Sequence, residues 1–329
     1  MNPQVSVIVP TYNRRHLVGP TLAGALAQED VDLEVVVVDD CSPDGTAEYL
    51  TGLELPRLRV FRNDVNRLQA FTRNRGIAEA RGEWIAFLDD DDLWAPNKLR
   101  EQLRVAEEAE ASIAFSAAYL LNQDKFATDV FYPCPPETQP AEILTRYTVP
   151  AGCSNMIVRA DLLDDVGGFD EHLDTASDWD LFIRLLLTRP AAVLNEPHVG
   201  YVLHDNAVST GNIERQFEDF EFLRRKYQHA RREYGVEADG VQFSRWLAAG
   251  LRRGGRRMDA MRAYIYGGVH YRNFGNLVRA AAVPLGERWM KLGSKESEYA
   301  PAVQPEWLDL YRPGGKLAEL HPAASDLVS

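Results

Sequence analysis

Short apolar runs alternate with helical patterns in the first part of the chain. Three runs contain almost only apolar residues: Val5–Pro10, Leu33–Val38 and Trp84–Leu88. Runs without regular polar alternation are typical of strands that are buried on both faces, as in a parallel sheet. Helical stretches lie between them, at Leu17–Gln28, Gly45–Leu50 and Ala70–Ala80. This order of elements predicts an α/β fold with a doubly wound, mostly parallel sheet.

The pattern changes after the proline-rich stretch Pro133–Pro140, which we interpret as a loop or a crossing between two halves. A further strand is predicted at Asn155–Arg159 and a helix at Trp179–Leu187, whereas Ile213–Tyr234 is highly charged and helical in period. We expect a first domain over residues 1–210, with halves at about 1–110 and 111–210, then a helical region over 211–329 that ends in a polar, partly disordered tail.

Composition limits the class of protein. The chain has 329 residues, 45% of them hydrophobic, which is enough for a packed core. No apolar run reaches the roughly 18 to 20 residues that span a bilayer, and the start does not have the pattern of a signal peptide. Three cysteines with no metal or redox spacing indicate a reduced, cytoplasmic setting. The net charge of -13 argues against a general nucleic-acid binder.

Polar residues follow three of the predicted strands: Thr11–Arg14, Asp39–Ser42 and Asp89–Asp92. Ligands of open parallel sheets bind beyond the carboxyl ends of the strands, so we expect these residues to share one edge. Four consecutive carboxylates repel one another unless a cation or a hydrogen-bond network compensates, and carboxylates suit Mg²⁺ and Mn²⁺. The alternative is an acidic turn that caps the helix beginning near Pro96.

Other enzyme classes that use such a sheet lack their motifs here. A dinucleotide-binding protein needs a glycine-rich turn after the first strand, and the turn that begins at Thr11 contains no glycine. No P-loop motif is present, which argues against a P-loop phosphotransferase. A sugar nucleotidyltransferase would also need a glycine-rich, basic loop at this first turn.

Five motifs, taken together and in order, resemble those of the inverting family 2 glycosyltransferases of the GT-A fold. They cover roughly the first 210 residues: Val5–Arg14, Val36–Thr46, Asn66–Trp94, Gly168–Leu186 and Tyr201–Thr210. The resemblance implies a metal-assisted transfer of a sugar from a nucleotide-sugar to an acceptor hydroxyl. It does not identify the donor sugar or the acceptor.

The resemblance assigns the nucleotide contacts to the first strand ends. It implies that the turn Pro10, Thr11, Tyr12 and Asn13 lines the base and ribose, and that Asp39 accepts a hydrogen bond from the base. A carboxylate can accept from the imino N–H of uracil, thymine or guanine, which narrows the donor to UDP-, dTDP- or GDP-sugars. Three further residues match positions near the ribose or diphosphate: Arg73, Asp89 and Asp90. Leu68 stands where the family often has glycine, so we expect a different loop shape before Arg73.

The resemblance also implies the metal ligands and the catalytic base. Asp91 matches the ligand of a Mn²⁺ or Mg²⁺ ion that bridges the diphosphate, with a register uncertain by one residue within the acidic run, and His204 matches a histidine near this ion. Asp178 matches the catalytic base, with Asp180 in support. Ser177 stands where the family commonly has glutamate.

These implications predict a metal-dependent inverting glycosyltransferase in glycan, glycolipid or protein-glycosylation assembly. The alternative is a catalytically silent nucleotide-sugar-binding or regulatory protein of the same fold. Arg245–Lys291 holds ten basic and two acidic residues interleaved with apolar ones, which is the composition of an interfacial helix. It predicts peripheral contact with the inner membrane face, where a lipid-linked acceptor would wait; otherwise its arginines pair with the surplus of acidic residues on the first domain.

Overall fold

The computed structural model describes residues 2–203, 212–285, 304–312, 315 and 317, and the chain divides into two compact units. We call them the α/β unit, made of Met1–Gln139, Thr148–Val202 and Pro301–Ser329, and the helical unit, made of Pro140–Tyr147 and Leu203–Ala300. The α/β unit therefore includes a C-terminal segment that follows the helical unit in the sequence. No helix among the described residues is both long and apolar enough to cross a membrane.

A nine-stranded mixed sheet forms the α/β unit, in the order β3-β2-β1-β4-β8-β6-β9-β5, with β7 paired to β6. The four strands from β3 to β4 are parallel, and the antiparallel pairs lie in the other half. The strands are β1 (Val5–Thr11), β2 (Leu33–Asp39), β3 (Leu58–Arg62), β4 (Trp84–Phe87), β5 (Leu93–Trp94), β6 (Ile113–Leu121), β7 (Ala127–Phe131), β8 (Ile157–Arg159) and β9 (Ala192–Val202). The predicted α/β class and doubly wound sheet are thus confirmed.

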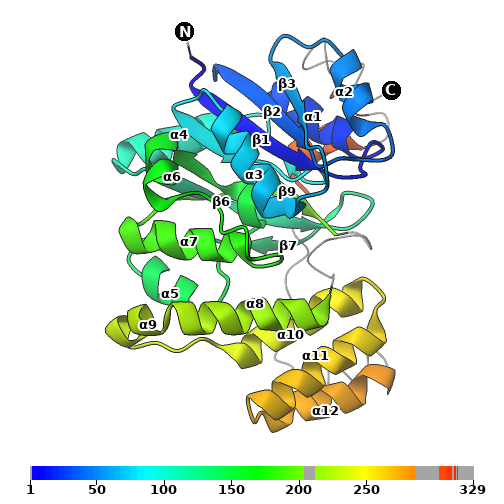
Figure 1. Ribbon diagram of the computed structural model, residues 1–329, viewed down its shortest axis with the longest axis vertical. Helices are drawn as coiled ribbons and strands as arrows, with labels where there is room; N and C mark the ends of the chain where they lie inside the picture. Colours follow the sequence, from blue (N-terminus) through cyan, green and yellow to red (C-terminus); the bar gives the residue numbers. More distant parts are fainter. Residues whose placement is uncertain (1, 204–211, 286–303, 313–314, 316, 318–329) are drawn as a thin grey trace. The chain divides into compact units, whose positions relative to one another are not determined.

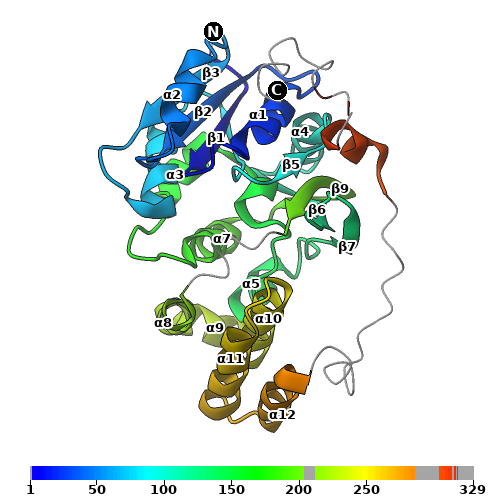
Figure 2. The same ribbon diagram turned by 90° about the vertical axis from the view of Figure 1, so that its right-hand side faces the viewer.

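Helices cover both faces of this sheet (Figures 1 and 2). On β1, alternate residues Val5, Val7 and Val9 join the core cluster that includes α1, while Ile8 points to α3. Gly76 of α3 permits this contact, because a Cβ there would lie 2.4 Å from a methyl carbon of Ile8. The apolar runs lack polar alternation because both faces are covered. The helices of this unit are α1 (Val18–Leu26), α2 (Thr46–Gly52), α3 (Leu68–Glu79), α4 (Lys98–Glu108), α6 (Ala160–Val166) and α7 (Ser177–Thr188), with 3₁₀ turns η1 (Gly152–Asn155) and η4 (Glu306–Tyr311).

Part of the predicted tail is an ordered piece of the α/β unit. In η4, Leu308 is fully buried and Tyr311 nearly so, and both belong to the same core cluster as β1 and α1. Apolar residues of the sequence EWLDLY, spaced for one helical face, explain this burial. Of the rest of the tail, the described residues are Gln304, Pro305, Arg312, Gly315 and Leu317.

The helical unit has its own core of aromatic and aliphatic side chains. Its helices are α8 (Ile213–Lys226), α9 (Gln228–Tyr234), α10 (Gly240–Arg253), α11 (Arg257–His270) and α12 (Phe274–Ala282), with η3 (Val283–Leu285); most of α5 (Gln139–Thr145) also belongs here. Leu247 and Tyr264 pack inside this core. These two apolar residues of the predicted interfacial segment therefore stabilise the unit and do not face outward.

Candidate active site

Three strand ends meet at the carboxyl edge of the parallel half of the sheet. The register of β1 and β2 pairs Thr11 with Asp39, and that of β1 and β4 pairs Ile8 with Phe87. The acidic run Asp89–Asp92 follows β4 directly, and Thr11 Oγ1 donates to Asp90 Oδ2 over 2.6 Å. The structure thus brings together the three polar segments that follow these strands: the turn at Thr11, the turn at Asp39 and the acidic run Asp89–Asp92.

Asp39 ends β2 with one carboxylate oxygen engaged and the other open. The residue is fully buried, and its Oδ2 accepts from the backbone N–H of Ser42 at 2.9 Å, with Arg62 Nε at 3.6 Å. Among the described residues, Asp39 Oδ1 has no hydrogen-bond partner. A buried polar atom without a partner is costly, so this oxygen has a reason to accept from a ligand.

The other residues of the first turn shape the same edge. Pro10 and Thr11 are buried at the end of β1, whereas Tyr12 is 46% exposed and available to a planar ligand. Asn13 adopts the left-handed conformation, with φ of 56°, and its backbone N–H donates to Ser42 Oγ over 2.8 Å. This hydrogen bond ties the first turn to the turn after Asp39.

Asp40 anchors the loop that leads into α3. Its Oδ1 accepts from the side chain of Asn63 and the backbone N–H of Arg67, and its Oδ2 accepts from the backbone N–H of Leu68. Leu68 has φ of 67°, a left-handed conformation that costs a residue with a Cβ about 1–2 kcal/mol. Glycine avoids this cost, which accounts for the family's usual residue at this position; Leu68 adopts the conformation despite its side chain.

The acidic run alternates between two environments. Asp90 and Asp92 are buried; Asp90 accepts from Thr11, and Asp92 Oδ1 accepts from the backbone N–H of Val202 at 3.2 Å. Burial, together with repulsion from Asp91, raises the pKa of Asp90 to about 8 and that of Asp92 well above its usual range. These two carboxyls therefore favour the protonated form, which limits the charge repulsion within the run.

The two less buried carboxylates of the run each face an arginine. Asp89 Oδ1 accepts from Arg73 Nη2 over 2.5 Å, and Asp91 Oδ2 lies 3.6 Å from Arg14 Nη1. The side chains of Asp89 and Asp91 are 25% and 19% exposed, so a ligand can reach both. The sequence placed Arg14 at this edge with Thr11 but assigned it no role; its contact with Asp91 is visible only in the structure.

Arg73 connects the acidic run with the predicted base. Burial disfavours its charge, but the nearby carboxylates of Asp89 and Asp178 outweigh burial and raise its pKa. The guanidinium also lies 5.4 Å from the ring centroid of Phe169. Arg73 is thus a buried cation that pairs with a carboxylate following β4 and is stabilised electrostatically by Asp178 at the start of α7.

Asp178 and Asp180 lie in the first turn of α7 but have different surroundings. Asp178 is partly exposed and accepts from the backbone N–H of Trp179, whereas Asp180 is fully buried and pairs with Arg184 at 2.8 Å. Arg184 also donates to the backbone carbonyl of Val166, at the end of α6. The pair therefore fixes the start of α7, and with it the position of Asp178.

A metal that binds without substrate would need several protein ligands, and the described residues hold no group of three such side chains. Mg²⁺-type ions in nucleotide enzymes commonly use one or two carboxylates together with substrate phosphates. Asp91, accessible and next to a second carboxylate at Asp89, fits that smaller donor set. His204 lies outside the described residues.

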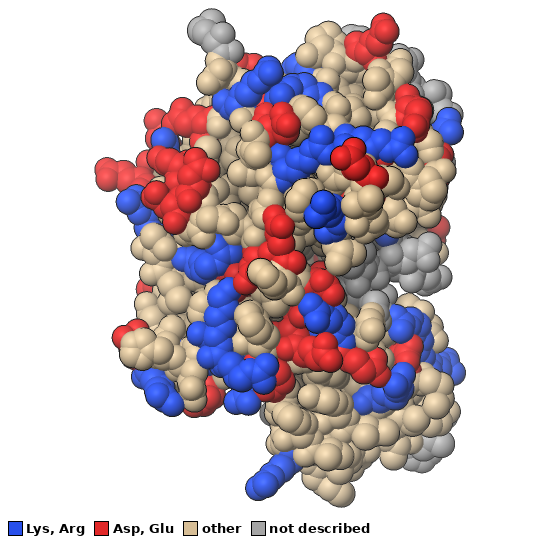
Figure 3. Space-filling view, viewed as in Figure 1, with Lys and Arg blue, Asp and Glu red and all other residues tan. Residues whose placement is uncertain are grey.

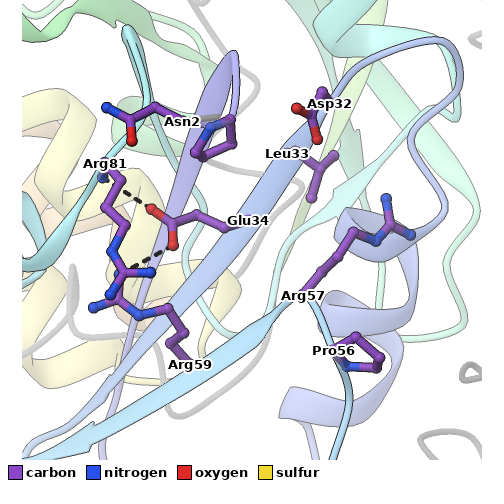
Figure 4. Close-up of a pocket in the computed structure, with 9 residues that line it drawn as sticks. Asn2, Asp32, Leu33, Glu34, Pro56, Arg57, Arg59 and Arg81 are labelled. Carbon is purple, nitrogen blue, oxygen red and sulfur yellow. Dashed lines mark hydrogen bonds and ion pairs between the residues drawn. The ribbon is translucent and has the colours of Figure 1, made fainter.

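A separate hollow of about 260 Å³ lies at the opposite edge of the sheet (Figure 4). Its lining includes Asp32 and Glu34 at the start of β2 and three arginines. Arg59 Nη1 pairs with Glu34 at 3.0 Å, and the backbone N–H of Arg81 also donates to Glu34. None of the predicted site residues lines this hollow, so its position separates it from the site.

Comparison with known families agrees with this geometry. The model of the family described as "Glycosyl transferase family 2" matches residues 6–166. The succinoglycan biosynthesis protein ExoO of Rhizobium meliloti (strain 1021) is 34% identical over 228 residues, which cover 65% of this chain and 63% of that protein. TuaG of Bacillus subtilis (strain 168), which its name assigns provisionally to teichuronic acid biosynthesis as a glycosyltransferase, is 30% identical over 63% of this chain and 82% of its own length.

A third relative names its substrates. WfgD of Escherichia coli, named as a UDP-Glc:alpha-D-GlcNAc-diphosphoundecaprenol beta-1,3-glucosyltransferase, is 24% identical over 72% of this chain and 87% of its own length. All three matches extend well beyond any single motif. They cover 65%, 63% and 72% of this chain.

Solved structures share the fold at low sequence identity. A fragment of S. aureus TarS in complex with UDP-GlcNAc has a TM-score of 0.52 at 19% identity, covering 87% of this chain and 93% of that one. The mannosyltransferase PcManGT of Pyrobaculum calidifontis, in complex with GDP-Man and Mn²⁺, has a TM-score of 0.52 at 17% identity, covering 89% and 83%. With its GT-A-type fold, the chain therefore belongs to glycosyl transferase family 2.

Proposed function

We propose that this glycosyltransferase moves a sugar from a nucleoside diphosphate sugar to an acceptor hydroxyl, with inversion at the anomeric carbon. The observation that carries the proposal is the buried Arg73, which pairs with Asp89 at 2.5 Å and whose charge Asp178 also stabilises. Asp89 belongs to the acidic run on the nucleotide side, and Asp178 is the proposed base on the acceptor side. One buried cation therefore joins the two halves that a transfer reaction needs.

The nucleotide half reads the base through Asp39. Its open, buried Oδ1 is an acceptor for an imino N–H, which uracil, thymine and guanine carry and cytosine and adenine lack. Pro10, Thr11, Tyr12 and Asn13 line the base and ribose, with Asp89 or Asp90 toward the ribose. UDP-, dTDP- and GDP-sugars are the donors that fit, and the structural neighbours were solved with UDP-GlcNAc and GDP-Man.

The diphosphate lies at the accessible part of the acidic run. Asp91 would hold Mn²⁺ or Mg²⁺ together with the diphosphate, and His204 is the proposed second ligand. When bound, this ion neutralises the negative charge that develops on the leaving diphosphate. Arg73 adds a fixed positive charge beside the same group, and Arg14 compensates Asp91 in the free protein.

The acceptor half uses Asp178 as general base. Asp178 takes the proton of the attacking hydroxyl as that oxygen bonds to the anomeric carbon and the bond to the diphosphate breaks, which inverts the configuration. Asp180 supports it indirectly, because the pair with Arg184 fixes the first turn of α7. General base catalysis typically contributes roughly 10²- to 10⁴-fold to the rate.

Titration calorimetry with nucleoside diphosphates and Mn²⁺ tests the nucleotide half. We expect UDP, dTDP or GDP to bind and ADP and CDP to bind much more weakly, because only the first three donate an imino N–H to Asp39. Asp39→Asn should reduce this preference while the protein stays folded. Equal affinity for all five nucleotides would contradict the assignment.

Donor hydrolysis distinguishes the enzyme from a catalytically silent nucleotide-sugar binder. A glycosyltransferase with an intact base transfers some sugar to water when acceptor is absent, so free sugar should accumulate with the donor that binds. A wild-type protein that binds the donor and releases no sugar over a prolonged incubation would favour the silent binder.

For the acceptor, we propose a lipid-linked glycan at the cytoplasmic membrane face, a class that the name of one relative contains. The helical unit offers a surface for such a membrane. Between Ala260 and Leu285 the chain has no Asp or Glu, in a protein of net charge -13. Exposed apolar side chains gather there on α11 and α12: Ile265, Val269, Phe274, Leu277 and Val278. Figure 3 shows little red over this part of the helical unit.

On this surface, apolar side chains suited to the lipid interface lie next to arginines that attract anionic lipids. Phe274 is 77% exposed and Val269 66%, a cost in water that burial in the lipid interface would remove. Arg272 and Arg279 border them, and each arginine near an anionic leaflet contributes about 1 kcal/mol. By contrast, Arg256 just before α11 pairs with Asp259, and Arg262 within α11 pairs with Glu214, so these basic residues are partly compensated within the unit.

Vesicle flotation at low salt tests the membrane contact. The wild type should float with vesicles that contain phosphatidylglycerol and not with pure phosphatidylcholine. Phe274→Ser combined with Val278→Ser should abolish flotation, and Arg272→Gln combined with Arg279→Gln should weaken it. Flotation of the wild type with neither lipid would contradict the proposal.

A further inference from the structure

The last described segment returns to the α/β unit and forms what we call the C-terminal strap, Gln304–Arg312. The side-chain amide of Gln304 makes two hydrogen bonds to the backbone of Ala127, accepting at 2.9 Å and donating at 2.8 Å. At the other end, Lys125 Nζ donates to the backbone carbonyl of Tyr311 over 2.7 Å. Figure 2 shows this segment in red-orange beside α4. Both ends are thus fixed to the turn between β6 and β7.

Tyr311 reaches from the strap into the core of the unit. Its hydroxyl donates to the backbone carbonyl of Trp94 in β5 over 2.6 Å. The ring lies against α1 at Gly24, where a Cβ would come within 2.0 Å of the Tyr311 hydroxyl. Only glycine permits this approach. Burial raises the pKa of Tyr311, so the hydroxyl stays a donor at neutral pH.

Trp94 connects this contact to the acidic run. β5 has two residues, lies at the edge of the sheet and follows Asp92 directly. The indole of Trp94 donates to the backbone carbonyl of Ser154 over 2.8 Å, and Ser154 Oγ accepts from the backbone N–H of Asp89 over 3.0 Å. The two ends of the run are therefore held by one small network that Tyr311 completes.

The strap also touches the strand that pairs with β5. Trp307 packs over Gly200 of β9, where a Cβ would lie 3.3 Å from its ring. Two residues further along β9, Val202 donates its backbone N–H to Asp92. Thr21 of α1 donates to the backbone carbonyl of Asp92 over 3.0 Å. Three of the elements that the strap contacts, α1, β5 and β9, thus also hold or flank Asp92.

We infer that Tyr311 is a positioning residue: through Trp94 the C-terminal strap holds the acidic run in the geometry that presents Asp89 and Asp91 to the diphosphate. The physical need is clear, since consecutive carboxylates repel one another and the edge strand that follows them is short. The ligand in this inference rests on the proposed function, whereas the ordering of the run does not.

Hydrogen–deuterium exchange on the free protein tests the ordering without any ligand. Tyr311→Phe removes the hydroxyl. Gly24→Ala keeps the tyrosine at position 311 but places a methyl group where its hydroxyl lies, so the hydroxyl must move. Both should speed exchange in the peptide that covers Asp89–Trp94 by about tenfold, as expected when a buried hydrogen bond is lost. The control is Ser6→Ala, which removes a buried hydroxyl that donates to Glu34 at the opposite edge of the sheet.

Titration calorimetry with UDP and with GDP, each with and without Mn²⁺, supplies the second measurement. The strap variants should weaken the Mn²⁺-dependent part of the affinity about 3- to 10-fold, whereas Ser6→Ala should not, even at an equal loss of thermal stability. Gly24→Ala and Tyr311→Phe together should cost less than the sum of the single effects, because they act on one contact.

The outcomes separate the two proposals. If neither nucleotide binds to the wild type, the proposed function fails, and the exchange measurement still decides the role of Tyr311. If exchange over Asp89–Trp94 is the same in both strap variants as in the wild type, or rises equally in Ser6→Ala, Tyr311 only adds stability and the inference is wrong.

Discussion

Arg73 donates a hydrogen bond to Asp89 over 2.5 Å, and Asp178 also helps to raise the pKa of this buried arginine. The nucleotide and acceptor sides of the site are therefore electrostatically coupled through one guanidinium. Asp89→Asn would remove the ion-pair partner of Arg73, whereas Asp178→Asn leaves the pair of Arg73 with Asp89 in place. Substitution of Asp178 should consequently alter catalysis first and the fold only slightly.

Asp178→Asn tests whether Asp178 is the catalytic base. We expect turnover to fall roughly 10²- to 10⁴-fold while donor affinity stays nearly unchanged, because the carboxylate acts on the acceptor proton and not on the nucleotide. The measurement is kcat and KM for the donor, with affinity from calorimetry. Turnover within about threefold of the wild type would exclude Asp178 as the base.

Asp180→Asn is the matched control for this variant. Asp180 is buried and paired with Arg184, so its loss should lower the free energy of unfolding, with a smaller effect on turnover at temperatures where the protein is folded. A larger loss of turnover in Asp180→Asn than in Asp178→Asn would make Asp180 the better candidate.

Metal binding should depend on the nucleotide. Because the described residues hold no group of three metal-binding side chains, we expect free Mn²⁺ to bind weakly to the protein alone and tightly once UDP or GDP supplies phosphate oxygens. Mn²⁺ electron paramagnetic resonance measures both. Asp91→Ala should abolish the nucleotide-dependent signal change, and its nucleotide affinity should no longer respond to EDTA. An EDTA response equal to that of the wild type would contradict the role of Asp91.

The sequence predicted three strands of the parallel half of the sheet because each is a short, nearly uninterrupted apolar run. Val5–Pro10, Leu33–Val38 and Trp84–Leu88 match β1, β2 and β4 within one residue at either end, since strands covered on both faces need apolar side chains throughout. Five strands were not predicted: β3, β5, β6, β7 and β9. β5 has only two residues, which is too few for any periodicity.

The site was predictable to the extent that its residues follow these strands. Asp39, Thr11 and the acidic run meet as expected from parallel register alone. The alternation within Asp89–Asp92 was not predictable, because it depends on Thr11 and Val202 contacting every second carboxylate. The same limit applies to the C-terminal strap, whose contact with Trp94 joins residues 217 positions apart.

Leu68→Gly should stabilise the protein. Leu68 has φ of 67° and a side chain that is 53% exposed, so the substitution relieves backbone strain and gives up little burial. The relief of about 1–2 kcal/mol outweighs the roughly 0.5–1 kcal/mol that glycine costs in the unfolded chain, and we expect a net gain of up to about 1.5 kcal/mol. Urea unfolding measures it. Leu68→Ala keeps the Cβ and should show no gain; an equal gain in Leu68→Ala would show that backbone strain is not the cause.

Lys98 should make stability depend on pH. It is fully buried, with Nζ donating to Gln102 Oε1 over 2.7 Å and lying 3.9 Å from the ring centroid of Trp94. Burial lowers the pKa of Lys98 well below its usual value, so between that lowered pKa and about 10.4 the unfolded chain binds a proton that the folded protein does not. Stability must then rise with pH across this window. Lys98→Met removes the group, so the wild type should gain stability relative to this variant as the pH rises from 7 to 9.

Urea unfolding of both proteins at pH 7, 8 and 9 measures this difference. One proton contributes at most about 1.36 kcal/mol per pH unit, which sets the upper limit of the slope. Lys226→Met removes an exposed lysine and corrects for the general effect of losing one positive charge. The sign is the decisive quantity, because a lysine held as a cation against Trp94 would give no gain or the opposite trend. A flat difference after the Lys226 correction would mean that Lys98 stays protonated in the folded protein.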